Sequence, residues 1–210
     1  MEFVKFSEVA LGLMLVGSFA SAADQFKLSQ EQVKEFERRC ENGDMLFCAG
    51  LGDIYYRGLY GRKNTAKAIG LYKKACDKNY YMACNSLGAA YIDGEGVKQN
   101  YKKAVELYAK ACDGNDSSGC SNLGAMYYDG KGVKIDIVKG GAYMRRACDV
   151  GDWAGCYNFA FHNYTVGDKQ RAKKYYKKAC DLGRNTDDVK NIPSNKEIWQ
   201  KACDMYEILK

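Results

Sequence analysis

The cysteines of this 210-residue chain recur at a fixed interval, and no other feature restricts its fold as strongly. Two series of four cysteines each have a spacing of 36 residues, and the second series follows the first by eight residues. The series are Cys40, Cys76, Cys112 and Cys148, and Cys48, Cys84, Cys120 and Cys156. Self-similarity with a period of about 20 to 50 residues is typical of stacked structural repeats. Cys180 and Cys203 complete the ten cysteines outside the two series.

Each period contains two helical patterns. The first places small or apolar residues at i, i+3, i+4 and i+7, which is one face of a helix: Cys84, Leu87, Gly88 and Tyr91. The second has the same spacing at Ala104, Leu107, Tyr108 and Ala111. Two short helices cannot bury their apolar faces alone, so neighbouring units must stack. The sequence therefore predicts an all-α fold, an α/α solenoid of 36-residue helix pairs.

Glycine and asparagine mark the ends of these patterns. We expect a left-handed turn after each second helix, at Gly43, Asn79, Asn115, Gly151 and Gly183. Glycines also lie inside the first helices, at Gly52, Gly88 and Gly124, where each costs about 1 kcal/mol relative to alanine. Their recurrence in phase predicts a close approach of two helices at these positions.

The cysteine spacing predicts the disulfides. Cysteines separated by seven residues join the last turn of one helix to the first turn of the next, where their Cα atoms can approach to the roughly 4.4–6.8 Å that a disulfide requires. We therefore pair Cys40–Cys48, Cys76–Cys84, Cys112–Cys120 and Cys148–Cys156, which leaves Cys180–Cys203. Thiolate zinc sites use closer spacings, and the chain has a single histidine, so we expect no metal and no cofactor.

The ends of the chain depart from the repeat. Residues 9–19 are mostly apolar or small and precede Ala20-Ser-Ala22, which predicts a signal peptide over 1–22 that is cleaved after Ala22; an attached apolar helix is the alternative. Residues 23–44 should form a capping helix that opens on a capping box at Ser29 and Gln32. Four repeats are expected over 45–184, the fourth shortened by four residues near Thr165. An irregular segment with a capping helix is expected over 185–210. We expect a secreted or periplasmic protein, since disulfides persist in oxidising compartments.

The recurring phrases Leu-Gly-x-x-Tyr-x-x-Gly-x-Gly-Val and Tyr-x-Lys-Ala-Cys resemble the Sel-like repeats, which are relatives of tetratricopeptide arrays. With the Cys-x7-Cys spacing, the chain is most similar to the Helicobacter cysteine-rich proteins, from Ser29 to Lys210. The resemblance implies an exported bacterial solenoid that meets the host, with penicillin binding and slow β-lactamase activity. No Ser-x-x-Lys, Ser-Asp-Asn or Lys-Thr-Gly motif is present, so the catalytic residues of such a hydrolase stay unknown.

A binding module is therefore the preferred function. The first helices should line a concave groove that holds a peptide or protein ligand. The groove residues that we expect are Ser86, Asn122, Met126, Asp129, Asn158 and His162, with Tyr128 and Tyr164 as further candidates. A β-lactam or a cell-wall fragment is the alternative ligand. We expect a monomer with no membrane span and no nucleic-acid partner.

Two further patterns belong to the surface. Basic pairs recur on the second helices, at Lys73-Lys74, Lys102-Lys103, Arg145-Arg146, Lys173-Lys174 and Lys177-Lys178, and predict a solvated convex face. Asp113-Gly-Asn115-Asp-Ser117 resembles a bacterial N-glycosylation sequon, although Asn115 also fits the turn.

Overall fold

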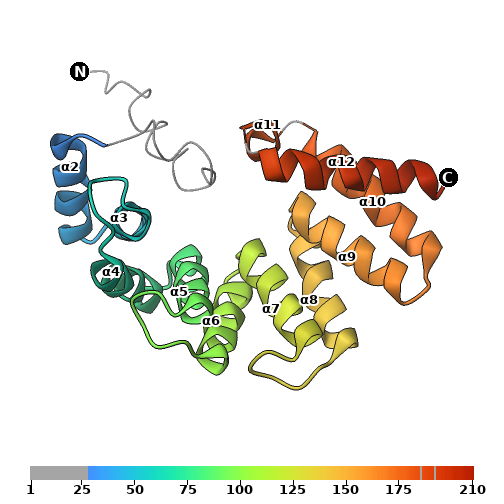
Figure 1. Ribbon diagram of the computed structural model, residues 1–210, viewed down its shortest axis with the longest axis horizontal. Helices are drawn as coiled ribbons and strands as arrows, with labels where there is room; N and C mark the ends of the chain where they lie inside the picture. The colour runs from blue at the N-terminus through green and yellow to red at the C-terminus, as the bar shows by residue number, and fades with distance from the viewer. Residues whose placement is uncertain (1–27, 185, 192) are drawn as a thin grey trace.

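The computed structural model describes residues 28–184, 186–191 and 193–210, and in these ranges its regular elements are all helices. The helices lie along an arc that opens between the first and the last of them (Figure 1). They are α2 (Gln30–Glu41), α3 (Met45–Arg57), α4 (Thr65–Asp77), α5 (Tyr81–Asp93), α6 (Tyr101–Asp113), α7 (Ser117–Asp129), α8 (Ile137–Asp149), α9 (Trp153–Thr165), α10 (Lys169–Gly183), α11 (Asp187–Asn191) and α12 (Pro193–Ile208). The predicted α/α solenoid is confirmed. The predicted signal peptide lies outside the described residues.

The N-terminal helix begins with the capping box that the sequence predicts. The Ser29 hydroxyl accepts a hydrogen bond from the Gln32 backbone N–H at 3.2 Å, and the Gln32 side chain accepts one from the Ser29 backbone N–H at 2.9 Å. These bonds satisfy two of the N–H groups that a helix start leaves free. α2 then packs on α3, where the rings of Phe36 and Phe47 meet edge to face at 4.9 Å. The solenoid therefore begins on a helix that covers the first repeat.

Disulfides and left-handed turns fix the junctions between repeats. The structure contains Cys40–Cys48, Cys76–Cys84, Cys112–Cys120, Cys148–Cys156 and Cys180–Cys203. The turns between the helices take a positive φ at Gly43, Asn79, Asn115 and Gly151, as predicted. The prediction for Gly183 is wrong, because α10 continues through it. A side chain there would collide with the indole of Trp199, which donates a hydrogen bond to the Cys180 carbonyl at 2.9 Å.

The glycines inside the first helices allow the predicted close approach. A Cβ atom on Gly88 would lie 2.7 Å from Cε1 of Tyr108, and one on Gly52 would lie 2.6 Å from Cε1 of Tyr72. Both tyrosines belong to the second helix of the same repeat and are buried. Each ring therefore packs directly on the backbone of the first helix.

The fourth repeat is shortened where the sequence predicts. α9 and α10 are joined by residues 166–168, whereas α7 and α8 are joined by residues 130–136. Gly130 ends α7 in the left-handed conformation with a φ of 69°. In the fourth repeat Gly167 takes a φ of 87° in the tight turn that replaces the longer loop.

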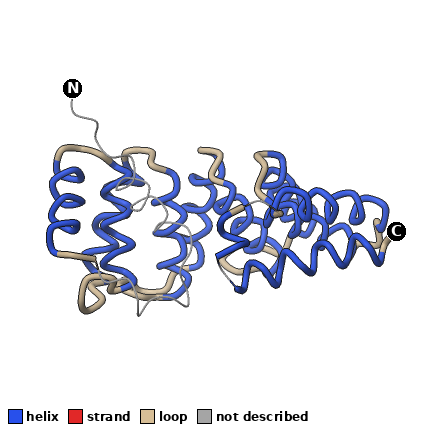
Figure 2. Tube along the Cα trace, turned by 90° about the horizontal axis from the view of Figure 1, so that it is seen from above, coloured by secondary structure: helices blue, strands red, loops and turns tan. Residues whose placement is uncertain are grey.

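The curvature of the solenoid places the first helices of the repeats on its inner side. Hydrogen bonds join consecutive first helices directly: Tyr56 to Asp93 at 3.4 Å, Asn122 to Asn85 at 2.8 Å, and Tyr128 to Thr165 at 2.8 Å. Consecutive second helices are joined by long basic side chains instead. Seen from above, the helix pairs follow one another along the molecule (Figure 2). The first helices α3, α5, α7 and α9 therefore form the concave face.

Four of the basic side chains on the second helices act as clamps between repeats. The Nζ atoms of Lys74, Lys110 and Lys178 donate to the carbonyl oxygens of Cys40, Cys76 and Cys148 at 2.9, 2.7 and 3.0 Å. Each accepting carbonyl belongs to the last turn of α2, α4 or α8, where a positive charge also stabilises the helix dipole. Lys74 is exposed and Lys178 partly buried, so both lie on the convex surface while each also joins two repeats.

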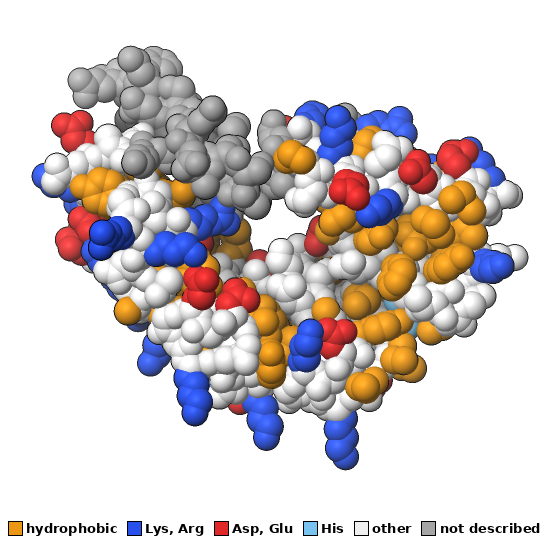
Figure 3. Space-filling view, viewed as in Figure 1, with side chains coloured by type: hydrophobic (Ala, Val, Ile, Leu, Met, Phe, Trp, Pro, Cys, Tyr) orange, Lys and Arg blue, Asp and Glu red, His pale blue; other side chains and the backbone are white. Residues whose placement is uncertain are grey.

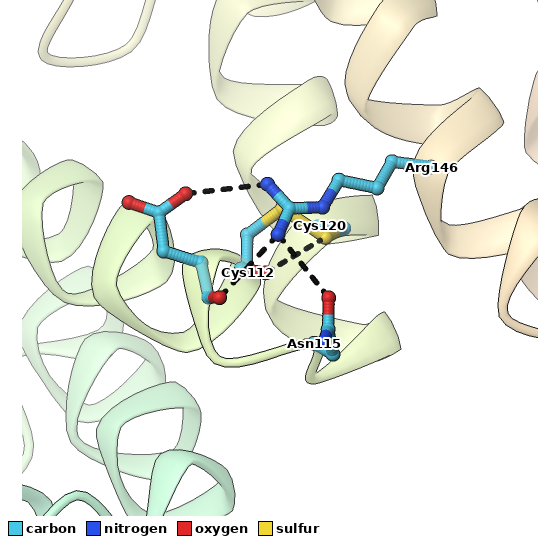
Figure 4. A network of polar contacts seen from close by, with 5 residues as sticks. Cys112, Asn115, Cys120 and Arg146 are labelled. Atoms are coloured by element: carbon cyan, nitrogen blue, oxygen red, sulfur yellow. Dashed lines mark hydrogen bonds and ion pairs between the residues drawn. A yellow bond between two sulfur atoms is a disulfide. The ribbon is translucent and has the colours of Figure 1, made fainter.

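Arg146 makes the equivalent contact at the third junction (Figure 4). Its guanidinium donates to the Asp113 carboxylate at 3.2 Å, to the Asp113 carbonyl at 3.4 Å and to the Asn115 side-chain oxygen at 3.2 Å. The Arg146 side chain is 39% exposed, so it makes these bonds at the solvated surface. The carboxamide of Asn115, the residue of the predicted sequon, is held in this network.

Candidate functional site

The concave face carries a pocket between α7, α8 and α9, with an accessible volume of about 150 Å³. Two of the three helices are first helices of consecutive repeats, so the stacking of the repeats creates the pocket. Most of the lining is apolar or aromatic, and its members are Ala125, Tyr128, Asp129, Met144, Asn158, Phe161 and His162. An apolar cavity of about this volume can hold a benzene ring. The pocket is thus large enough for one apolar side chain.

The structure brings together three of the predicted groove residues. Asp129, Asn158 and His162 all line the pocket. Ser86 is half-buried one repeat further toward the N-terminus. The Asn122 amide donates to Asn85 and so joins two first helices. Since the Asn122 oxygen can accept a further bond, it stays a candidate for a ligand contact.

Met126 is not a groove residue, and that prediction is wrong. Its side chain is 5% exposed and packs in the core with Leu123 and Val105. The helical register explains the error, because i, i+3 and i+7 from Asn122 lead to Ala125 and Asp129 on the groove face. Met126 lies on the neighbouring face, in a cluster that Val105 of α6, the second helix of the preceding repeat, packs against.

His162 forms one wall of the pocket and occupies a position that is apolar in the earlier repeats. One and two periods upstream the same position holds Met126 and Ala90, which are both buried. The imidazole Nδ1 lies 3.3 Å from the Tyr128 hydroxyl, and the ring stacks on Phe159 with centroids 5.9 Å apart. The opposite edge of the ring lies against Gly141 of α8, where any Cβ atom would collide with it.

The surroundings of His162 favour the neutral imidazole. Partial burial lowers the pKa of His162 below its ordinary value of 6.5. Desolvation disfavours the charged form of a base, which is the direction seen here. Asp129 is the one charged member of the lining, and Lys131 donates to its carboxylate at 2.8 Å. Both partners of this ion pair are about half exposed, so a ligand can compete for the carboxylate.

Exposed apolar side chains lie near the ends of two helices that line the pocket. Phe161 is 49% exposed, Tyr164 42% and Val166 55%, all at the C-terminal end of α9. Ile135, Ile137 and Val138 are also exposed where α8 begins. Hydrophobic side chains gather on this part of the molecule (Figure 3). Contiguous apolar surface of this kind marks interaction sites on soluble proteins.

Sequence reasoning missed Ala125, Met144 and Phe161. Ala125 and Phe161 are equivalent positions one period apart, and both lie three residues after a predicted asparagine. The i+3 spacing from Asn122 and Asn158 would have placed them on the groove face. Met144 comes from a second helix, so only the packing of α8 between α7 and α9 reveals its place.

The described residues contain no group of three or more His, Cys, Asp or Glu side chains that could hold a metal ion. Pockets that take drug-sized ligands usually measure about 300–1,000 Å³. The pocket is smaller, and its one charged side chain is an aspartate that would repel the carboxylate of a penicillin. Among the described helices, none is long and apolar enough to cross a membrane.

Comparisons with known proteins agree with this architecture. The Sel1 repeat family matches residues 47–80, 82–116, 117–152 and 156–183. The fold is similar to a Sel1 repeat protein from Oxalobacter formigenes, with a TM-score of 0.69 and 21% identity over 96% of this chain and 84% of that one. A protective antigen of uropathogenic Escherichia coli with an SLR fold has a TM-score of 0.65 and 22% identity, and the match covers 95% of this chain and 45% of that one.

A third similar structure shares the cysteine-rich character. Helicobacter pylori cysteine rich protein B has a TM-score of 0.50 and 29% identity over 65% of this chain and 96% of that one. Among curated proteins, a sequence search finds no match to this chain.

Proposed function

Because the chain belongs to the Sel1 repeat family, whose solenoid fold commonly mediates protein–protein interaction, we propose that it binds a peptide or protein ligand on its concave face. One observation carries the proposal. The pocket between α7, α8 and α9 is lined mainly from two first helices, and exposed apolar side chains lie near the ends of α8 and α9. Burying such surface against a partner supplies about 25 cal/mol per Å² before the entropy of association is subtracted.

Polar side chains beside the pocket can fix a bound main chain. Asn158 lines the pocket, and Asn122 and Ser86 occupy the same position in the two preceding repeats. An asparagine carboxamide can both donate to a backbone carbonyl and accept from a backbone N–H. An extended peptide that follows the first helices would meet these groups in turn.

The proposed place of action is outside the cytoplasm. Five disulfides are typical of an oxidising, extracytoplasmic compartment. We propose export to the periplasm or the medium, with cleavage after Ala22 and contact with host molecules as one outcome. Mass spectrometry of the exported protein should then find Ala23 at its N-terminus. An exported chain that retains residues 1–22 would contradict the cleavage.

A pull-down with a blocked groove tests the proposed binding. Ala125 lines the pocket and is exposed, so Ala125→Trp should fill the pocket without disturbing the core. Ala66 is exposed on the second helix α4, so Ala66→Trp adds the same ring outside the groove. The oxidised protein and the Ala66→Trp variant should capture the same partner from extracts of the native organism, and Ala125→Trp should lose it. Equal capture by all three would reject the concave face as the binding site.

A further inference from the structure

The pocket between α7, α8 and α9 has the dimensions and the chemistry of a subsite for a single side chain. Its volume of about 150 Å³ fits one leucine-sized or phenyl group. Tyr128 and Phe161 supply apolar walls from two repeats, and Met144 supplies the wall from α8. Phe161 is 49% exposed in the free protein, so a ligand can cover apolar surface that is now in contact with water.

Asp129 bears on the charge of the ligand residue that lies next to the bound apolar side chain. It is the one charged residue of the lining, and its carboxylate is paired with Lys131, which follows it by two residues. Both side chains are about half exposed, so a cationic group of a ligand can replace the Lys131 ammonium without leaving a buried charge unpaired. An acidic neighbour would face the carboxylate directly. The charge therefore complements a basic residue next to the apolar one.

His162 completes the wall as a polar residue in a core position. Its counterpart one repeat earlier is Met126, a member of a core cluster that Val105 packs against, and the position equivalent to Val105 is Gly141. The glycine makes room for the imidazole, because a side chain there would collide with the ring. The Tyr128 hydroxyl at 3.3 Å then fixes the ring orientation. His162 and Gly141 thus stand where the preceding units have Met126 and Val105.

We propose that this pocket is the specificity subsite of the concave groove, that it takes one apolar side chain followed by a basic residue in an extended peptide, and that His162 makes the binding sensitive to pH. This inference rests on the proposed binding function. Neutral imidazole presents an uncharged wall to the apolar side chain. Protonated imidazole would have to lose water beneath the ligand, which disfavours binding.

The groups around His162 define the direction of the pH effect. Tyr128 and Asp129 face it from α7, Gly141 and Met144 from α8, and Asn158, Phe159 and Phe161 from its own helix, while Tyr175 of α10 packs behind Phe159. Of these, Asp129 alone is charged at neutral pH, and a basic ligand residue would engage it. Affinity should therefore fall as the pH drops through the lowered pKa of His162.

Model peptides provide a direct test on the oxidised protein. The probes are capped hexapeptides of the sequences Gly-Gly-Leu-Lys-Gly-Gly, Gly-Gly-Leu-Glu-Gly-Gly and Gly-Gly-Ala-Lys-Gly-Gly, titrated into the ¹⁵N-labelled protein and followed by NMR. The Leu-Lys peptide should shift the backbone signals of Tyr128, Phe161 and His162. The Ala-Lys peptide should bind about tenfold more weakly, as expected for several missing methylene groups, and the Leu-Glu peptide should also bind more weakly.

Matched variants distinguish binding in the subsite from non-specific binding to exposed apolar surface. Phe161 and Val150 are both 49% exposed, but only Phe161 lines the pocket. Phe161→Ala should weaken Leu-Lys binding about tenfold, whereas Val150→Ala should leave it unchanged. Asp129→Asn should remove the preference of lysine over glutamate. Because Phe161 and Asp129 are partly exposed, these variants should retain the melting temperature of the parent within a few degrees, about as for other surface substitutions.

The pH dependence is tested with His162→Gln, which is uncharged at every pH used. Binding of the Leu-Lys peptide to the parent should weaken by up to about tenfold between roughly pH 7.5 and pH 5.5, and binding to His162→Gln should not change. Equal responses to the three peptides, no effect of Phe161→Ala, or the same pH profile in His162→Gln would each overturn the inference. If Ala125→Trp still abolished capture of the native partner, the concave face would remain the binding site, and only the proposed preference for an apolar and a basic residue and the role of His162 would be rejected.

Discussion

At the scale of single residues, the contrast between Gly88 and Gly70 shows what the in-phase glycines do. Both lie inside helices, Gly88 in α5 and Gly70 in α4. A Cβ atom on Gly88 would lie 2.7 Å from Tyr108, whereas no atom lies within 4 Å of a Cβ on Gly70. The first glycine recurs with the repeat and the second does not. Recurrence therefore marks the position where two helices touch.

The two glycines should respond in opposite directions to alanine. Gly88→Ala pushes a methyl group into the ring of buried Tyr108 and should lower the free energy of unfolding by about 1–3 kcal/mol. Gly70→Ala adds helix propensity without a contact and should raise it by up to about 1 kcal/mol. Urea denaturation of the oxidised variants measures both values. Destabilisation of equal size in the two variants would contradict the packing explanation.

Asp53 adds a pH-dependent contribution to stability. The Tyr72 hydroxyl donates to its carboxylate at 2.6 Å, yet burial outweighs this bond and raises the pKa of Asp53 above its ordinary value of 3.8. The folded protein therefore holds this proton more tightly than the unfolded chain. The free energy of unfolding should fall as the pH rises from about 3.8 through the raised pKa of the folded state, and then level off.

Asp53→Asn removes this titration while keeping an oxygen for the Tyr72 hydroxyl. The variant should be more stable than the parent at neutral pH, and the difference should shrink toward acidic pH. Urea titrations at a series of pH values provide the measurement. A constant difference across that series would mean that Asp53 does not titrate as its burial indicates.

At the scale of helices, each junction combines a disulfide, a tight turn and a basic clamp. Closing the nine-residue loop between Cys76 and Cys84 is worth roughly 2–3 kcal/mol in the chain-entropy model. The clamp joins the same junction to the next repeat, since Lys110 donates to the Cys76 carbonyl at 2.7 Å. The disulfide thus fixes the geometry within a junction, and the lysine holds the following repeat against it.

Lys74 and its neighbour Lys73 allow the clamp to be measured. Lys74 donates to the Cys40 carbonyl at 2.9 Å, while Lys73 is exposed one position earlier on the same helix. Lys74→Met should lower the free energy of unfolding by about 1 kcal/mol through the lost charge-assisted bond at a helix C-terminus. Lys73→Met should change it by less than about 0.5 kcal/mol. A similar result for the two variants would show that the bond contributes nothing.

At the scale of the whole molecule, the core is a series of clusters and not a single centre. One cluster joins residues from α2 to α6 and includes Tyr72 and Leu87, and another lies in the C-terminal part around Tyr176. Each repeat contacts its neighbours, so the stability of the array is approximately a sum over repeats and interfaces. The last repeat has a neighbour on one side only and depends on α12 for cover.

Mild reduction should therefore open the Cys180–Cys203 disulfide first. Cys203 is half-buried, whereas the eight cysteines of the regular junctions are at most 3% exposed. Thiol exchange requires access to a sulfur atom, so the C-terminal disulfide should react before the others. Alkylation during a reduction time course, followed by peptide mapping, gives the order. Earlier labelling of Cys112 or Cys120 would contradict a protected array with a labile end.

The sequence by itself determined the period, the helix pairs, the caps and the pairing of the cysteines that the structure contains. These properties are local: a capping box at Ser29 or a left-handed turn at Asn79 depends on residues a few positions apart, and the repeat presents each signal several times. The predicted left-handed turn at Gly183 was wrong because that position is not decided locally. Its contact with Trp199 comes from a segment outside the repeats.

Only the tertiary structure decided which helix faces meet and what lies in the groove. Met126 and Ala125 are adjacent in the sequence, but one packs in the core and the other lines the pocket. Lys73 and Lys74 are likewise adjacent, and one of them reaches a carbonyl of the preceding helix pair. A rotation of about 100° per residue separates such neighbours, and the curvature of the array, which sets the partner of each face, arises from the packing of all the repeats together.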